Sequence, residues 1–272
     1  MSEAAPSIAI ERLTHVYRDG GVRALDAVGL AIRPGERVAL IGQNGSGKTT
    51  LVRHLNGLLR PTEGRVVIGD RDAGRMTVAQ LAREVGLVFQ DPDRQIFSGT
   101  VRAEVEFGAR NVGMRGTELA AAIADALEQT GLTAEGKTNP YDLGASRRKL
   151  LSLASVLAMR TPVLVLDEPT TGQDAHGIER VRAVVDRLGA EGRTIVAISH
   201  DMRFVAEVFE RVVVLRAGRI VLDSTPDAVF SADAWEALRS THLEPPLAAR
   251  VGQRLGLGST PTDDALIARL AQ

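Results

Sequence analysis

The stretch RVALIGQNGSGKTTLVRHL, residues 37–55, decides the fold of this chain. Its first five residues are a short apolar run of the kind found in buried strands. Gly42 to Thr49 match the pattern G-x-x-x-x-G-K-[ST], and the residues after them have a helical pattern. Glycines in this context let backbone N–H groups turn inward around phosphate oxygens, while the helix points the positive end of its dipole at them. The stretch therefore predicts a phosphate-binding loop.

The loop residues have individual expected roles. Lys48 is expected to reach the β- and γ-phosphates of a nucleotide, and the Thr49 hydroxyl to bind Mg²⁺. The alternative is a glycine-rich turn that happens to end in Lys-Thr, and the flanking strand and helix argue against it. The remaining residues expected to contact the nucleotide are Gly42, Asn44, Gly45, Ser46, Gly47 and Thr50.

In three further segments, a polar residue stands at the end of an apolar run. VLVLDEP places Asp167 at the end of a buried strand and Glu168 just beyond it. An Asp at this position is the usual second magnesium anchor of phosphate-loop proteins, and the adjacent Glu is placed to polarise an attacking water. On its own, the segment could be any strand that ends in acids. His200 and Gln90 also follow strand-like runs, but a lone histidine there is more often a structural hydrogen-bonding group.

Bulk composition restricts the possible partners. The 272 residues include 44% hydrophobic and 25% charged residues, the formal net charge is -1, and there is no cysteine. Disulfides and thiolate metal sites are therefore excluded, and no electrostatic argument favours nucleic acid as a partner. No apolar stretch approaches the roughly 18 residues that span a bilayer. Any membrane association is expected to come through a partner.

The order of these motifs resembles the ATPase subunit of an ABC transporter over about residues 7–225. The resemblance implies an α/β fold with a phosphate-loop NTPase core, an N-terminal antiparallel β subdomain and a helical signature subdomain at about residues 91–160. After a boundary near residue 225, we expect a small C-terminal helical extension, residues 226–272, in which short helical pieces alternate with Pro and Gly.

The same resemblance assigns roles residue by residue, with ATP and Mg²⁺ as cofactors. Tyr17 is implied to stack on adenine, and Gln90 to sense Mg²⁺ and the membrane partner. Glu168 becomes the general base and His200 a switch that contacts the γ-phosphate. Asp174 belongs to the D-loop, which lies across the dimer. The segment TTGQD that contains it departs from the commoner S-A-L-D form, so coupling between the two sites of a dimer can differ in detail.

A narrower resemblance rests on QDPDRQIF, residues 90–97. It is similar to the ATPases of energy-coupling factor transporters, which import vitamins or transition-metal ions such as cobalt and nickel. This implies a peripheral protein on the cytoplasmic face of the cell membrane. Its implied partners are a second ATPase subunit, an integral membrane coupling protein and a substrate-binding membrane component. Residues 226–272 either contribute to pairing or pack on their own domain.

One segment departs from the family. The signature LSGGQ of these ATPases aligns with LGASR, which puts Gly144 in place of Ser, Ala145 and Ser146 in place of the glycines, and Arg147 in place of Gln. In the family, the signature closes over the γ-phosphate bound to the opposite subunit. A misplaced hydrogen-bond donor at a developing charge can cost on the order of 10²-fold in rate. We therefore expect a heterodimer with one competent and one impaired ATP site.

Three alternatives stay open at this point. Ser146, with the pair Arg147 and Arg148, could substitute for the usual signature. The chain could be a regulatory nucleotide-binding subunit that hydrolyses little ATP, although Glu168, Gln90 and His200 argue against this. It could also be a soluble ABC-type ATPase outside transport, which the near-neutral charge and single nucleotide domain disfavour.

Overall fold

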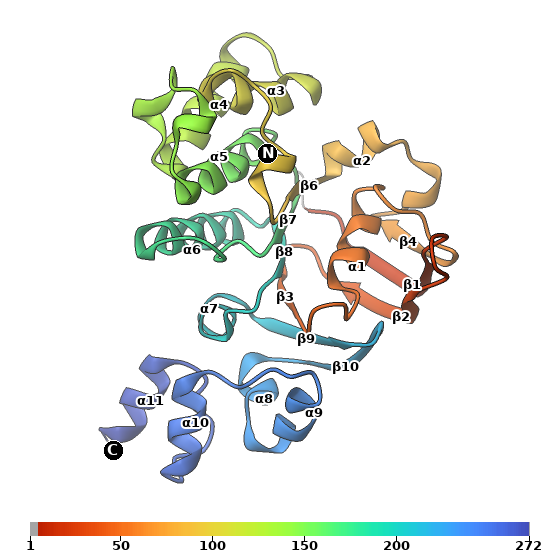
Figure 1. Ribbon diagram of the computed structural model, residues 1–272, viewed down its shortest axis with the longest axis vertical. Coiled ribbons are helices and arrows are strands. Elements are labelled where there is room, and N and C mark those ends of the chain that lie inside the picture. Colours follow the sequence, from red (N-terminus) through yellow and green to blue (C-terminus); the bar gives the residue numbers. More distant parts are fainter. Residues whose placement is uncertain (1–4, 272) are drawn as a thin grey trace.

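Two β-sheets form the centre of the molecule, which is a computed structural model describing residues 5–271 (Figure 1). The smaller sheet is antiparallel, with the order β2-β1-β4-β5. The larger has the order β10-β9-β3-β8-β7-β6 and is parallel except for β10. The strands are β1 (Ile8–Val16), β2 (Arg23–Ile32), β3 (Arg37–Ile41), β4 (Glu63–Ile68), β5 (Arg71–Asp72), β6 (Val85–Val88), β7 (Val163–Asp167), β8 (Thr194–Ile198), β9 (Arg211–Arg216) and β10 (Arg219–Ser224).

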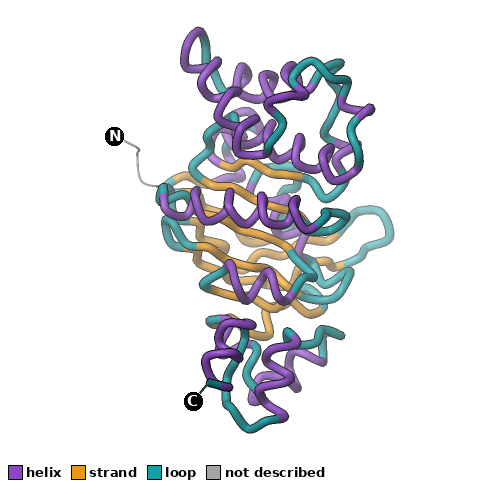
Figure 2. Tube along the Cα trace, turned by 90° about the vertical axis from the view of Figure 1, so that its left-hand side faces the viewer, coloured by secondary structure: helices purple, strands orange, loops and turns teal. Residues whose placement is uncertain are grey.

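Helices lie at both ends of the sheets. Helices α3 to α5 form one end of the molecule and α8 to α11 the other (Figures 1 and 2). Within the described residues, none of the helices is long and apolar enough to span a membrane. They are α1 (Lys48–Leu55), α2 (Val78–Glu84), α3 (Val101–Asn111), α4 (Gly116–Thr130), α5 (Ala145–Leu157), α6 (Ala175–Ala190), α7 (Met202–Val208), α8 (Pro226–Val229), α9 (Trp235–Arg239), α10 (Leu247–Arg254) and α11 (Asp263–Leu270).

Local sequence signals explain several of these boundaries. Helix α4 ends at Gly131, whose φ of 67° is the left-handed conformation that a glycine C-cap adopts readily. Asp174 begins α6, since its carboxylate accepts a hydrogen bond from the Gly177 N–H at 2.7 Å. The antiparallel and parallel parts of the predicted α/β fold are confirmed. Helix α2 was not predicted, although Thr77 and Gln80 form a capping box at its start.

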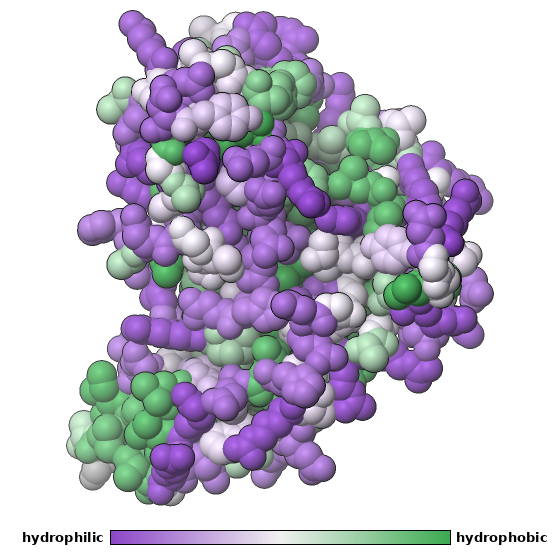
Figure 3. Space-filling view, in the orientation of Figure 1, coloured by the Kyte–Doolittle hydropathy of each residue, from purple (hydrophilic) through white to green (hydrophobic). Residues whose placement is uncertain are grey.

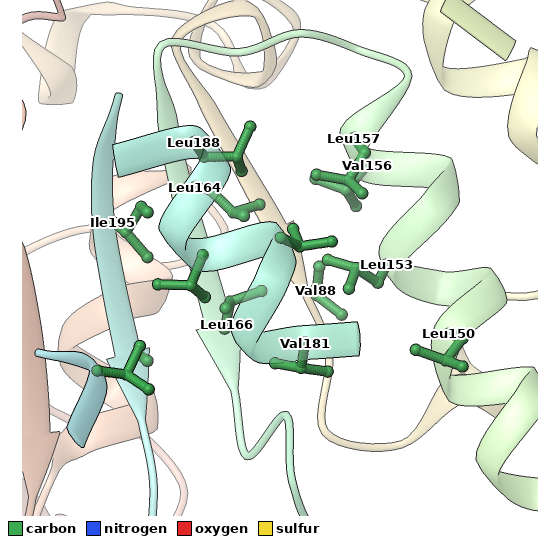
Figure 4. Close-up of a cluster of buried hydrophobic side chains, with 14 of the residues drawn as sticks. Val88, Leu150, Leu153, Val156, Leu157, Leu164, Leu166, Val181, Leu188 and Ile195 are labelled. Carbon is green, nitrogen blue, oxygen red and sulfur yellow. The ribbon is translucent and has the colours of Figure 1, made fainter. Parts of the chain in front are cut away.

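The central strands are buried on both faces. In β7, Leu164 and Leu166 belong to the cluster under α5 and α6, whereas Val163 and Val165 belong to the cluster on the opposite face. Figure 4 shows the first cluster, with Leu153 and Val181 directed towards the strands. This alternation follows from the two-residue period of a strand, and it explains why VLVLD is continuously apolar. Parallel strands also bring their carboxyl ends to one edge, where a site can form.

The C-terminal extension packs on the main body. Phe230 is 1% exposed and belongs, with Val229 and Leu238, to the same buried cluster as the strands of the larger sheet. Arg203 on α7 also forms an ion pair with Asp263 at the start of α11, at 3.0 Å. The extension therefore adds to the core of its own chain, which leaves a role in pairing open. The boundary near residue 225 stays a prediction.

Arg211 on β9 connects the two sheets. Its guanidinium bonds both carboxylate oxygens of Asp223 at 2.6 and 2.7 Å, and it donates to the Ala31 carbonyl of β2 at 2.8 Å. It also lies 3.2 Å from both carboxylate oxygens of Glu36, which is 6% exposed. Burial opposes ionisation of Glu36, but hydrogen bonds from the Arg33 N–H and from Arg211 outweigh it and lower the pKa of this carboxyl group.

Arg211→Met should destabilise the chain by about 2–3 kcal/mol at pH 7, because it leaves the buried Glu36 carboxylate with the exposed Arg33, at 3.3 Å, as its remaining charged partner. Urea unfolding of the purified chain measures this. The loss should shrink as the pH falls below about 4.3, since a depressed folded pKa confers stability that is present above the unfolded pKa and lost below it. Arg219→Met is the matched control, because Arg219 is 70% exposed and its half-buried partner Asp26 keeps a second arginine, Arg23, at 3.0 Å. Equal losses in both variants would contradict the prediction.

Candidate functional site

The phosphate loop requires glycine at specific positions. It leaves β3 at Gly42, with a φ of 147°, and enters α1 at Gly47, with a φ of 105°. A Cβ atom on Gly42 would lie 2.2 Å from the Leu215 carbonyl oxygen, and one on Gly47 would lie 2.5 Å from that of Ala24. The loop is thus held close to two neighbouring backbone segments, which a side chain at either glycine would displace.

Lys48 folds back over this loop. Its Nζ donates hydrogen bonds to the carbonyl oxygens of Gly42 at 2.6 Å and Gln43 at 2.9 Å. The side chain is 5% exposed, and burial lowers the pKa of Lys48, while the carboxylates of Glu168 and Asp167 act in the opposite direction. A buried ammonium group over inward-turned backbone suits a phosphate group, which supplies both negative charge and several acceptor oxygens.

Asp167, at the end of β7, offers an unpaired oxygen. It is 5% exposed, and its Oδ1 atom is buried with no hydrogen-bond partner among the described residues. Burial and the neighbouring Glu168 raise the pKa of Asp167, while the Thr49 hydroxyl and the charges of Arg53 and Lys48 lower it. Carboxylate and hydroxyl oxygens are the ligands that Mg²⁺ prefers in proteins. The orphaned oxygen beside Thr49 therefore fits the predicted metal ion.

Glu168 and His200 form a pair across two strand ends. Glu168 Oε1 lies 3.2 Å from His200 Nε2, and Glu168 Oε2 accepts hydrogen bonds from the His200 N–H at 3.2 Å and the Thr171 hydroxyl at 3.3 Å. Glu168 is 5% exposed and has a φ of 53°, in the left-handed region. Such strain costs about 1–3 kcal/mol in a non-glycine residue and is concentrated at functional sites. The surrounding contacts fix the carboxylate in one orientation.

These groups line one cavity of about 460 Å³. Tyr17 is at its edge, where its hydroxyl lies 3.0 Å from Thr50 Oγ1. Exposed Gln90 also reaches the cavity. Of the residues predicted to bind nucleotide or metal, Gly42 alone is absent from the lining, although its carbonyl oxygen holds Lys48. The lining includes Tyr17, Asn44, Gly45, Ser46, Gly47, Lys48, Thr49, Thr50, Gln90, Asp167, Glu168 and His200.

The signature residues lie outside this cavity. Gly144 is the N-cap of α5 and gives it no side-chain hydrogen bond, and Ala145 is the first residue of the helix. The Ser146 hydroxyl donates to Gln173 Oε1 at 2.5 Å, beside Asp174 in the D-loop. The signature serine is thus hydrogen-bonded to the D-loop segment of its own chain.

Arg147 is also held inside the chain. Its guanidinium donates to the Gly131 carbonyl oxygen at 3.0 Å and pairs with the Glu135 carboxylate. The next arginine, Arg148, donates to the Leu143 carbonyl oxygen at 3.2 Å. Both cations of the LGASRR segment therefore have partners within their own helical region.

Sequence reasoning missed Lys149. This residue follows the two arginines on α5 and is 7% exposed, and its Nζ donates to the carbonyl oxygens of Glu168 and Thr171, both at 2.6 Å. Burial lowers the pKa of Lys149, and the nearby carboxylates oppose this effect. Lys149 thus links the helix that carries the signature to the loop that carries Glu168. Nothing in the basic run RRK distinguishes it from its two partly exposed neighbours.

Residues 25–171 match the ABC transporter family. The chain belongs to this family. The energy-coupling factor transporter ATP-binding protein EcfA of Methanothermobacter thermautotrophicus is 38% identical over 258 residues, which are 94% of this chain and 82% of that protein. The resemblance to energy-coupling factor ATPases is thereby confirmed.

Solved structures agree with this assignment. CbiO1 of Clostridium perfringens, described as part of the ABC transporter complex CbiONQ, superposes with a TM-score of 0.76 at 32% identity, covering 92% of this chain and all of that one. A dimeric ATP-binding cassette bound to ADP and Pi gives a TM-score of 0.74 at 26% identity, covering 80% of this chain and 98% of the other. The ABC ATPase fold is confirmed.

Several relatives are longer than this chain. Four proteins described as ABC transporter ATP-binding proteins, three of them from Methanosarcina species, are 40–46% identical to it. The chain spans less than half of their length, between 41% and 46%.

Proposed function

We propose that this chain binds and hydrolyses ATP with Mg²⁺ as one of two ATPase subunits of an energy-coupling factor importer. The observation that carries the proposal is the single cavity in which Lys48, Asp167, Glu168 and His200 meet. Each group has a use in phosphoryl transfer, where catalysis is mostly positioning and charge stabilisation. The presence of Glu168 and His200 disfavours a regulatory subunit, and the near-neutral charge and single nucleotide domain disfavour a soluble ATPase outside transport.

Each residue of the cavity has a separate role in ATP binding or hydrolysis in this proposal. Lys48 and the loop amides bind the phosphates, and Tyr17 stacks on the base. Thr49, Asp167 and Gln90 would hold Mg²⁺, which neutralises charge on the phosphate oxygens. Glu168 accepts the proton of the attacking water, and the His200 N–H and imidazole hold its carboxylate while His200 contacts the γ-phosphate.

The partner ATPase is a different subunit in this proposal. In the family, the signature acts on the nucleotide of the opposite subunit. Here the Ser146 hydroxyl donates to Gln173 and the Arg147 guanidinium pairs with Glu135, so both side chains are engaged within their own chain. This favours an impaired site on the partner and a competent one at Glu168, where a partner with an intact signature completes it.

A surface for pairing is available on the C-terminal extension. Apolar side chains gather over α10 and α11 at the lower end of the molecule (Figure 3). Leu247, Leu255, Ile267 and Leu270 are each more than half exposed there. Contiguous apolar surface of this kind marks interaction sites. It supports pairing through residues 226–272, in addition to their packing on the main body.

An apolar groove suits the membrane coupling protein. It has a volume of about 620 Å³ and lies between α2, α3 and α5. Phe97 and Phe107 meet edge to face at 4.7 Å and are 61% and 48% exposed, and Val78 of α2 is 49% exposed. Gln95 lines the groove and accepts the Phe89 N–H at 3.2 Å, which connects it to the segment carrying Gln90. A helix of a membrane protein fits such a groove.

The family resemblance implies a vitamin or a transition-metal ion as the cargo and the cytoplasmic membrane face as the location.

Replacing both Phe97 and Phe107 with serine should remove most of the chain from the membrane fraction of its native host, because their apolar surface docks the partner helix. Quantitative blotting of washed membranes measures this, and the co-purified membrane proteins identify the coupling partner. Leu58→Ser, at a residue 47% exposed outside the groove, is the control. Unchanged membrane recovery of the double variant, with wild-type chain bound to membranes, would contradict this docking site. Recovery of the wild-type chain only in the soluble fraction would contradict the transport function.

A further inference from the structure

Four residues behind the phosphate loop form a closed ring of contacts. His54 on α1 lies one helical turn after Thr50, and its Nδ1 is 2.7 Å from the Thr50 carbonyl oxygen. Its Nε2 lies 3.2 Å from Nδ1 of His15, near the end of β1. The His15 ring meets Tyr17 edge to face at 4.7 Å, and the Tyr17 hydroxyl returns to Thr50 Oγ1 at 3.0 Å. The ring joins the end of β1 to the helix that follows the phosphate loop, which lies beside it (Figure 1).

The two histidines have defined tautomers in this arrangement. A carbonyl oxygen can only accept, so His54 Nδ1 carries the proton that bonds Thr50. Burial lowers the pKa of His54, which is 2% exposed, and its Nε2 is therefore a bare acceptor. His15 Nδ1 lies 3.1 Å from the Arg60 carbonyl oxygen and must also carry a proton. The single N–H at this nitrogen is consequently shared between the Arg60 carbonyl oxygen and His54 Nε2.

The charged group nearest to the two histidines, the Arg60 guanidinium, does not bond either of them. The Arg60 guanidinium donates to the Met76 carbonyl oxygen at 2.7 Å and to that of Ala73, so only the main chain of Arg60 bonds the histidines. Tyr17 is the other titratable group in contact with His15. The pair is thus a directional connection whose two ends are both fixed by backbone carbonyl groups.

We propose that His15 and His54 are positioning residues that fix the Tyr17 ring for stacking on the nucleotide base. This inference rests on the proposed binding of ATP. Tyr17 directly follows β1 and precedes a turn, so its side chain would otherwise sample several rotamers before it stacks. Ordering one such side chain in advance strengthens binding by about 2- to 10-fold. The histidines provide this order without contacting the nucleotide.

The test compares two ligands on the purified full-length chain. His54→Leu removes both hydrogen bonds and keeps an apolar side chain at the buried position. It should weaken binding of Mg·ATP by about 5- to 10-fold, measured by displacement of a fluorescent ATP analogue. Binding of magnesium tripolyphosphate, which has no base, should stay unchanged, and this also reports that the loop is folded. His176→Leu, at an exposed histidine on α6, should change neither affinity.

Two further variants separate positioning from folding. His54→Asn keeps a donor close to the Nδ1 position and should recover part of the ATP affinity. In a Tyr17→Leu background, His54→Leu should cause no further loss, because the ring it positions is absent. Equal losses for ATP and tripolyphosphate, or additive losses in the double variant, would overturn the inference. Wild-type chain that binds tripolyphosphate but not ATP would instead contradict the proposed function.

Discussion

In the proposed heterodimer, Glu168→Gln should lower ATP turnover by about 10²- to 10⁴-fold, the usual contribution of a general base. An amide cannot take the proton of the attacking water. Its carbonyl oxygen still accepts the His200 N–H and the Thr171 hydroxyl, which bond the carboxylate at 3.2 and 3.3 Å, so the loop should keep its shape. Steady-state phosphate release from the reconstituted complex measures the loss, and a fluorescent ATP analogue checks that binding remains.

The same complex provides the control for asymmetry. The equivalent substitution in the partner should cost much less turnover, because that glutamate serves the site closed by this chain's LGASR segment. Glu179→Gln, at an exposed glutamate on α6, should have no effect. A larger loss from the partner's substitution would reverse the assignment of the two sites. If neither glutamate substitution lowers the turnover of a complex that hydrolyses ATP, then Glu168 is not the general base.

Local sequence was sufficient for the phosphate loop and for the strand ends. The apolar runs before Gly42, Asp167 and His200 predict buried parallel strands, whose carboxyl ends meet at one edge. The structure brings all three positions together, as the strand order β3-β8-β7 requires. The resemblance added Tyr17, which no local pattern singles out, and it gave a role to Gln90, which follows a strand-like run.

The contacts that the sequence did not predict are all between distant segments. Lys149 reaches Glu168 only because α5 packs beside the end of β7, and His15 reaches His54 only because the end of β1 meets α1. Neither side chain occupies a motif position. The bond between Ser146 and Gln173 likewise depends on how the signature helix meets the D-loop. Such pairs need tertiary packing, which spacing along the chain does not specify.

Restoring the signature should convert this chain into an active homodimer. The variant combines Gly144→Ser, Ala145→Gly, Ser146→Gly and Arg147→Gln, and its ATPase rate as a purified single subunit should rise about 10²-fold over wild type. A homodimer of the wild-type chain would have Lys48 and Glu168 at both sites but no intact signature at either. The variant supplies the missing donor to both sites at once, so the gain should be larger here than in the heterodimer.

The fold has room for the restored serine. Gly144 is at the N-cap of α5 with a φ of -61°, and a Cβ atom there has no neighbour within 4 Å, so a serine fits and is a favoured capping residue. Adding Glu168→Gln should abolish the gain, and Arg148→Gln alone, at the next arginine of the helix, should not produce one. If the restored chain binds ATP and associates as the wild type does but stays inactive, then LGASR does not limit the ATPase rate. A difference between the two ATP sites would then have to originate elsewhere. The next candidate is the TTGQD segment, because Ser146 bonds its residue Gln173.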